Sequence, residues 1–255
     1  MLKVKSNKLG KTVNILISVF AWFLIWQIAA LFINNSVILP GPIPTLLAFF
    51  LLFTKKYFWK AILFSLLRII AGFIIGIILG IALSLICRLL PFLNRFISIG
   101  MSVIKSTPVA SLIMILWLIF KSGNVPIVIA VLMVMPLVWQ NLSDGFDAID
   151  KELDELTRVF CLSKKKRLKL LVFPTLLRYF IPAVLTSVGL AWKAGIAAEI
   201  ISVVKYSIGK YIYDAKATFE SADMLAWTLV VIVISVLFEL LVKLLLRKVK
   251  GCYGA

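Results

Sequence analysis

Histidine is absent from this 255-residue chain, and acidic residues are scarce, with 11 Asp and Glu against 28 Lys and Arg. Without His, the chain lacks the usual general base, a common metal ligand, and the Ser-His and Cys-His catalytic pairs. Three Cys, at positions 87, 161 and 252, are an odd number without Cys-x-x-Cys spacing. This argues against a disulfide framework and a zinc site. We therefore expect no metal and no enzymatic activity.

Apolar residues are in excess, because they make up 62% of the chain while charged residues make up 15%. A soluble domain has roughly 45–50% apolar and ~25% charged residues, and a disordered chain has low hydrophobicity. The composition therefore predicts an all-α integral membrane protein, since backbone groups in lipid must be paired within helices. We expect a single transmembrane domain over residues 1–255.

Six apolar runs approach the length of about 20 residues that spans a bilayer. They lie at 13–33, 61–87, 97–120, 125–142, 176–204 and 225–246. Pro108 interrupts the third run. A shorter run, 45–53, should lie at the interface or pack on the bundle.

The net charge of +17 has a topological explanation. If residues 1–12 are cytoplasmic, the inner segments carry more than twice as many Lys and Arg as the outer segments, as the positive-inside rule requires. This orientation places both termini and loop 144–173 in the cytoplasm and loop 205–224 outside.

Gly72, Gly76 and Gly80 recur every four residues in the second predicted span. Such a stripe lets helix backbones approach closely. It predicts either tight packing within one subunit or an interface between subunits.

Loop 144–173 reads as two short helices rather than as a simple connection. Asp150 can cap the first helix and Ser163 the second, which we expect to end before Pro174. The apolar residues of the first helix recur on one face. They are Ile149, Leu153, Leu156 and Phe160. With nothing in the chain to cover this face, the loop is either a docking element for a soluble partner or a solvated loop whose Lys side chains contact anionic lipid.

The same loop contains Glu-Leu-Thr at 155–157, Cys161, Ser163 and Phe-Pro at 173–174. This pattern resembles the EAA loop of ABC importer permeases, in which Gly usually stands at the position of Cys161. The difference matters if that residue needs a positive φ, which Cys adopts only at a cost. The resemblance implies that the loop couples to an ATPase. The residues it assigns to coupling are Leu153, Asp154, Glu155, Leu156, Thr157, Phe160, Cys161, Leu162 and Ser163.

Further segments extend the resemblance to the nitrate/sulfonate/taurine group of binding-protein-dependent permeases. They are 39–42, 65–73, 115–118 and 190–199. The group implies a homodimeric pore in the inner membrane, in contact with lipid, two ATPase subunits that use ATP and Mg, and an extracytoplasmic binding protein. The chain contains no G-x-x-x-x-G-K-[ST] motif, so we expect it to bind no ATP. The positive-inside rule already explains the net charge of +17, so we expect no nucleic acid as a partner.

Charges inside the spans suggest two sites, because a charge near mid-bilayer costs several kcal/mol unless it is paired or hydrated. Arg68 and Glu199 are candidates for an ion pair between helices. Broken helices at membrane depth are tolerated where they line a cavity. The candidates for a solute path are Lys105, Thr107, Pro108, Trp192 and Lys193.

We therefore interpret the chain as the permease subunit of an importer for a small anionic solute. One alternative is the same machinery with a neutral or cationic heterocycle that resembles a vitamin precursor. The other is a self-contained secondary carrier or channel.

Overall fold

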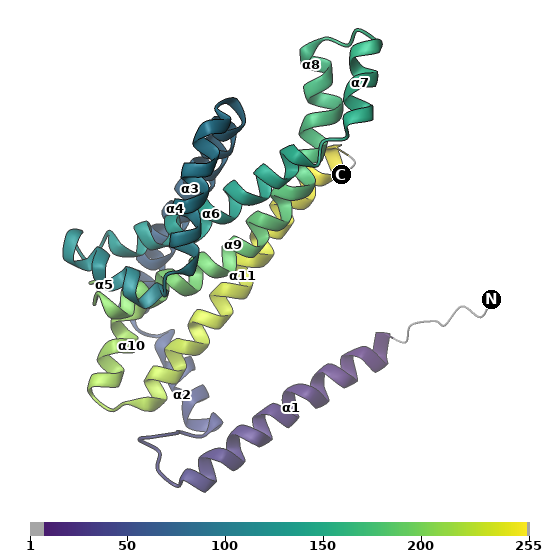
Figure 1. Cartoon of the computed structure of the whole chain (residues 1–255). Helices are drawn as coiled ribbons and strands as arrows, with labels where there is room; N and C mark the ends of the chain where they lie inside the picture. The colour runs from purple at the N-terminus through teal and green to yellow at the C-terminus, as the bar shows by residue number, and fades with distance from the viewer. Residues whose placement is uncertain (1–7, 254–255) are drawn as a thin grey trace. The chain divides into compact units, whose positions relative to one another are not determined.

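The computed structural model describes residues 8–253, in which α-helices and one π-helix are the regular structure and no strand occurs. The predicted all-α fold is therefore confirmed, while residues 1–7 of the predicted N-terminal segment lie outside the described part. Figure 1 labels most of the helices, whose bounds are α1 Lys8–Ile33, α2 Pro42–Leu52, α3 Lys56–Leu89, α4 Pro91–Ser106, α5 Val109–Ile119, α6 Val125–Asp147, α7 Lys151–Val159, α8 Lys164–Arg167, α9 Phe173–Ile201, α10 Ile208–Ala217 and α11 Ser221–Tyr253.

Within the described residues, four helices are long and apolar enough to cross a membrane, and a bent helix pair brings the number to five. The four are Lys56–Leu89, Ser122–Asp147, Lys164–Ile201 and Ser221–Arg247. The predicted number of six also counts α1, whose described apolar part, Ile17–Ile33, is shorter than the other spans.

The third predicted span is the bent pair, in which α4 and α5 meet at 105°. Pro108 has no N–H and disfavours a helical conformation in the residue before it. Thr107 accordingly has extended backbone angles, φ −78° and ψ 131°. Its Oγ1 donates a hydrogen bond to the carbonyl of Val103 (2.7 Å). The interruption predicted at Pro108 is thus present, as a sharp corner.

Contacts divide the chain into two compact units. The first unit comprises residues 1–58 and 211–230. Aromatic rings are prominent in it: Tyr211 stacks on both Tyr57 and Trp227, with ring centroids 4.9 and 5.1 Å apart. The proposal of one domain for the whole chain stays a prediction.

The second unit comprises residues 59–210 and 231–255 and is built around α6 and α9, which lie side by side (Figure 1). The glycine stripe of α3 faces α6 within this unit. A Cβ atom at Gly72 would lie 2.4 Å from the carbonyl oxygen of Ile127, and one at Gly76 would lie 2.7 Å from Cβ of Val134. Of the two interpretations of the stripe, packing within one subunit is therefore the one observed.

The second helix of the predicted loop does not end before Pro174, and this expectation was wrong. A π-helix, Leu168–Val172, joins α8 to α9, so that Lys164–Ile201 is one span candidate of 38 residues. Proline removes a hydrogen bond and its ring crowds the preceding turn. The wider i→i+5 pattern of a π-helix gives room at such a point, and the helix therefore passes Pro174 without a break.

Candidate functional site

The helical hairpin, residues 150–172, begins at two side-chain caps. The Asp150 carboxylate accepts hydrogen bonds from the backbone N–H groups of Glu152 (2.9 Å) and Leu153 (3.3 Å). The Ser163 hydroxyl accepts from the N–H of Lys166 (3.4 Å). Both caps satisfy N–H groups that an isolated helix end leaves unpaired. The sequence located both helix starts correctly.

The turn of the hairpin requires a left-handed residue, and Cys161 supplies it with φ 49°. The N–H of Leu162 donates to the carbonyl of Thr157 (3.0 Å), and that of Cys161 donates to the carbonyl of Arg158 (2.9 Å). This is the Schellman pattern, in which Gly is the preferred left-handed residue. The left-handed conformation at this position thus explains why the EAA pattern has Gly there. Cys161 adopts the same conformation at a cost in free energy.

Polar contacts hold the two helices of the hairpin together. The Arg167 Nε–H donates to Asp154 Oδ1 (2.5 Å), and Arg158 Nη2 lies 3.2 Å from Asp154 Oδ2. The hydrogen bond from Arg167, together with the charges of both guanidinium groups, lowers the pKa of Asp154 below its ordinary value. The carboxylate is therefore ionised at neutral pH and links α7 to α8.

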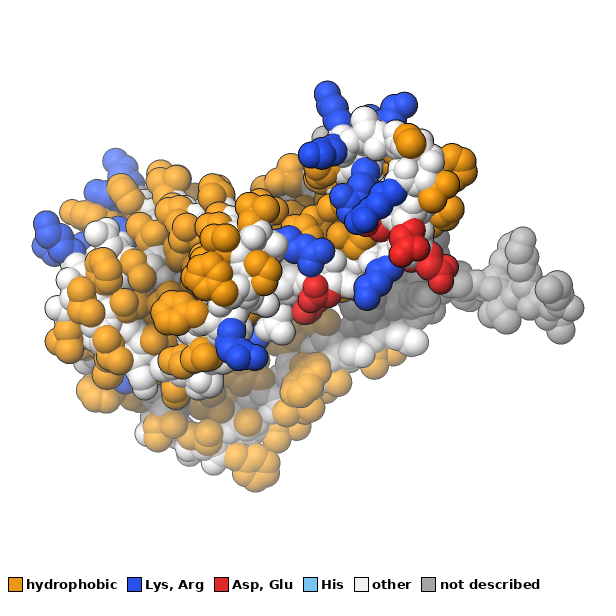
Figure 2. All heavy atoms as spheres, turned by 45° about the horizontal axis from the view of Figure 1, so that its top comes forward, with side chains coloured by type: hydrophobic (Ala, Val, Ile, Leu, Met, Phe, Trp, Pro, Cys, Tyr) orange, Lys and Arg blue, Asp and Glu red, His pale blue; other side chains and the backbone are white. Residues whose placement is uncertain are grey.

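The apolar side chains of the hairpin point outward. No residue of α7 is buried, and Val159 and Phe160 are 76% and 72% exposed. Leu153 and Leu156 are also exposed. Figure 2 shows basic side chains around the end of this hairpin, with apolar side chains beside them and acidic ones nearer its base. The hairpin thus has polar side chains between its helices and apolar side chains on its surface. A soluble domain has the opposite arrangement, and an exposed apolar patch of this kind marks an interaction site.

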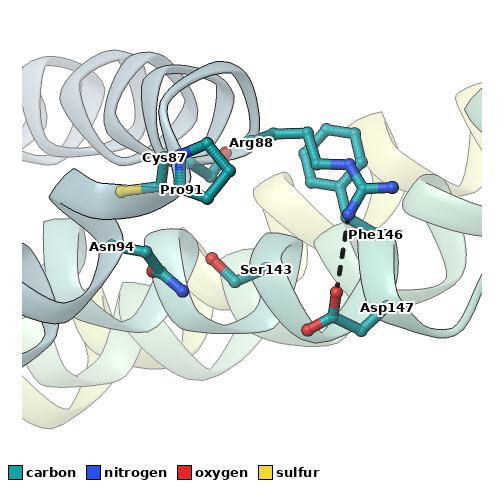
Figure 3. Close-up of a pocket in the computed structure, with 8 residues that line it drawn as sticks. Cys87, Arg88, Pro91, Asn94, Ser143, Phe146 and Asp147 are labelled. Carbon is teal, nitrogen blue, oxygen red and sulfur yellow. Dashed lines mark ion pairs between the residues drawn. The ribbon is translucent and has the colours of Figure 1, made fainter.

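A polar hollow of about 220 Å³ lies near the base of the hairpin, where α3 and α6 end (Figure 3). Arg88 of α3 and Asp147 of α6 form an ion pair across it, with Nη1 and Oδ1 3.7 Å apart. Both side chains are exposed, so the pair contributes little to stability. Ser84 of α3, Asn94 of α4 and Ser143 of α6 complete the polar lining.

Glu199 is fully buried and lies next to Arg68, at 3.6 Å between Oε1 and Nη1. Its other oxygen, Oε2, accepts from the Ser65 hydroxyl (2.7 Å) and from the N–H of Gly209 (3.3 Å). Ser65 in turn accepts from the N–H of Ile208 (3.0 Å). Glu199 therefore joins α3, α9 and the start of α10, where a carboxylate complements the helix dipole.

Sequence reasoning identified Arg68 and Glu199 but missed Ser65 and Gly209. Gly209 is required because a Cβ atom there would lie 2.4 Å from Cβ of Glu199. The sequence around Ser65 and Gly209 does not indicate their roles. Each residue matters because of its contact with Glu199, which lies far from Ser65 in the chain and across a turn from Gly209.

The path candidates lie around the corner between α4 and α5. Lys105 is exposed and donates a hydrogen bond to the side-chain oxygen of Gln140 on α6, a partner that the sequence did not suggest. Pro108 is exposed and Thr107 half-buried. Val109, directly after the corner, packs in the same apolar cluster as Ala194 of α9. Lys193, adjacent to Ala194, is exposed. The structure therefore brings the α4–α5 corner into the neighbourhood of Lys193.

Trp192 does not lie with these residues, so the prediction that it lines the path is corrected. Its side chain is fully buried, and its indole N–H donates to the carbonyl of Val231 (3.0 Å). The ring also lies 6.4 Å from that of Phe238. A side chain without exposed surface cannot touch a solute in this conformation, so Trp192 packs α9 against α11.

The apolar helices and the hairpin define a multi-span helical membrane protein with an exposed helical hairpin. The chain belongs to the family described as binding-protein-dependent transport system inner membrane component, which matches residues 72–251. It is thus an ABC importer permease subunit of the inner membrane, a transport component rather than an enzyme. Permeases of this family work in general as dimers with ATPase subunits, which use ATP, and a binding protein.

Two relatives from Synechococcus elongatus cover most of the chain. The nitrate import permease protein NrtB is 25% identical over 83% of this chain and 79% of its own length. The bicarbonate transport system permease protein CmpB is 28% identical over 84% of this chain and 81% of its own length.

Two solved structures share the fold. An amino acid ABC transporter crystallised with histidines has a TM-score of 0.62 and 14% identity, covering 77% of this chain and 95% of that chain. The MetNI methionine ABC transporter in inward-facing conformations has a TM-score of 0.53 and 15% identity, covering 75% and 93%.

Proposed function

We propose that two copies of this chain form the membrane pathway of an importer for a small anionic solute, which a binding protein delivers from outside. An ATPase subunit docks on each hairpin, and closure of the ATPase pair moves the hairpins and thereby the spans. The observation that carries this proposal is the outward apolar face of α7, formed by Leu153, Leu156, Val159 and Phe160.

The contacts inside the hairpin support a protein partner. Asp154 and Arg167 bind one another, so α7 contacts α8 through its polar side and leaves its apolar side free for a partner. Each large apolar side chain gains about 1.5–3 kcal/mol when it moves from water into a protein interior. An exposed set of four is therefore expected to have a partner that covers it, with Glu155 at the edge of the contact.

The length of the adjoining helix supports a partner beyond the membrane. The helical segment Lys164–Ile201 has 38 residues, which is about 57 Å at 1.5 Å per residue. A bilayer with its headgroups is about 40–45 Å thick. Even with a tilt of roughly 20°, the hairpin extends past the headgroups, so a soluble protein fits it better than lipid does.

The charge of the path candidates supports an anion as solute. Among the described side chains, neither Lys105 nor Lys193 has an ion pair with a carboxylate. Two uncompensated ammonium groups raise the local concentration of anions. The relatives named for nitrate and bicarbonate agree with this charge. No observation favours the alternatives of a neutral or cationic heterocycle or of a self-contained carrier.

Substitution of the apolar face tests the docking proposal. Leu156→Asp and Phe160→Asp should detach the ATPase from the purified complex and abolish coupled ATP hydrolysis in proteoliposomes. Lys151→Gln, an exposed position of α7 off the apolar face, is the matched control and should retain both. Normal ATPase retention in both Asp variants would refute docking at this face.

A further inference from the structure

The helix α4 has two apolar faces with different surroundings. At about 100° per residue, its residues divide cleanly by position around the axis. One face packs in the bundle: Met101 is buried in a cluster with Cys87 and Trp139, and Ile97 and Ile104 pack against it. The neighbouring face is apolar and exposed. Its residues are Phe92, Phe96, Ile99 and Val103.

The remaining face of α4 collects every polar residue of this 16-residue helix within an arc of roughly 120°. These residues are Asn94, Arg95, Ser98, Ser102, Lys105 and Ser106. Ser98 is half-buried and the others are exposed. Arg95 and Lys105 lie about 15 Å apart along the axis at 1.5 Å per residue.

Lipid cannot cover this polar face. Charged side chains in membrane-spanning segments face the bundle interior or a water-filled cavity. Among the described side chains, Arg95 has no carboxylate partner and Lys105 contacts only the amide oxygen of Gln140. The face is therefore basic as well as polar, and no carboxylate of the described residues compensates its charges.

Open space accompanies the polar face along its length. A surface hollow of about 580 Å³ is lined by Ser98, Ser102, Lys105 and Ser106, together with Ile99 and Val103. At the other end of the helix, Asn94 lines the separate hollow that contains the Arg88–Asp147 pair (Figure 3). The polar residues thus lead from the α4–α5 corner toward the base of the hairpin.

We propose that the polar face of α4 lines the solute path and is selective for small oxyanions. Arg95 and Lys105 attract the anion, and the serine hydroxyls of the same face donate hydrogen bonds to its oxygens. In this structure Ser98 and Ser106 donate to the carbonyls of Arg95 (2.9 Å) and Val103 (3.1 Å). A hydroxyl exchanges such a bond for an anion by rotation about its C–O bond. This inference rests on the proposed function. It adds which residues of α4 line the path and which chemical class of anion they bind.

Thiol labelling of the full chain in native membrane vesicles tests it without knowledge of the solute. The background carries Cys87→Ala, Cys161→Gly and Cys252→Ala. Probe cysteines are S98C, S102C and S106C on the polar face. The matched controls are F92C and F96C on the apolar face, neither of which lines the hollow. The probes are an anionic sulfonatoethyl and a cationic trimethylammonium-ethyl methanethiosulfonate.

The polar-face cysteines should react about tenfold or more faster than the controls, because the thiolate forms only in water. The anionic reagent should be favoured, and Lys105→Gln or Arg95→Gln should reduce that preference. Equal rates on both faces would refute the inference. So would polar-face cysteines that resist labelling and form disulfides between two copies, since the face would then be a dimer contact. Retention of the ATPase, measured on the same vesicles, reports on the proposed function separately.

Discussion

At Gly72, α3 lies so close to α6 that a methyl group has no room. A Cβ atom there would lie 2.4 Å from the carbonyl oxygen of Ile127 and 2.7 Å from Cβ of Ala130. Ordinary contacts of a Cβ atom begin near 3.4 Å, so Gly72→Ala requires the helices to separate by about 1 Å. A gap of that size loses a quarter to a half of the dispersion energy of the contacts it opens.

The expected cost follows from two opposing terms. Overpacking of a tight contact typically costs about 1–3 kcal/mol, and a backbone carbonyl cannot swing away as a side chain can. Ala is more favourable than Gly in a helix by about 1 kcal/mol, which offsets part of this. The difference is about 0–2 kcal/mol, and because the carbonyl is fixed we expect its upper half, a net loss of about 1–2 kcal/mol. Thermal unfolding of the detergent-solubilised protein should then show a melting temperature lower by about 2–8 °C.

Gly100→Ala provides the matched control, because it makes the same change in a helix where an added Cβ atom has nothing within 4 Å. It should leave the melting temperature unchanged or raise it slightly. Equal effects of the two substitutions, or a Gly72→Ala protein as stable as wild type, would show that α3 and α6 do not pack as described.

Four further results are expected. Cys161→Gly should stabilise the hairpin by about 1 kcal/mol, seen as slower proteolysis there, because it relieves a left-handed Cys; faster cleavage would contradict this. Gly209→Ala should destabilise the protein by about 2–3 kcal/mol in thermal unfolding, since it displaces Glu199. In sealed cells, an impermeant thiol reagent should label a cysteine placed at Asn35 but not Cys161; external labelling of Cys161 would overturn the predicted orientation. Lys193→Met should greatly reduce anion uptake while ATPase assembly stays normal.

Features that depend on local sequence were predictable. The caps at Asp150 and Ser163 and the break at Pro108 each arise from the backbone chemistry of one or two residues. Helix periodicity also identified three exposed apolar residues at α7, Leu153, Leu156 and Phe160. It included Ile149, which is half-buried before the helix begins, and missed the exposed Val159. These signals need no knowledge of the rest of the fold.

Most features that depend on distant partners were not predictable, and the Arg68–Glu199 pair was an exception because a charge inside a span needs a partner. Ser65 and Gly209 matter only because α3 and α10 meet Glu199, which no local pattern encodes. Trp192 was assigned to the path from its neighbour, although a step of one residue turns a side chain by about 100° around a helix. The passage of the helix through Pro174 depends on a π-helix, and a proline by itself ordinarily indicates the end of a helix rather than a π-helix.

Lys193 is the residue at which the path hypothesis is most directly testable. It is exposed while Trp192 and Ala194 on either side are buried, and an added Cβ atom at Gly189, one turn before it, would meet nothing within 4 Å. Because lipid does not stabilise an unpaired ammonium group, this open face of α9 should meet water between two copies. Lys193→Met preserves the bulk of the side chain and removes only its charge. Uptake of the small anion that the proposed function assigns should therefore fall severely in proteoliposomes, with basal ATP hydrolysis unchanged, whereas Lys243→Met on α11 should have no effect. Normal uptake, or failure of the variant to assemble, would remove Lys193 from the path.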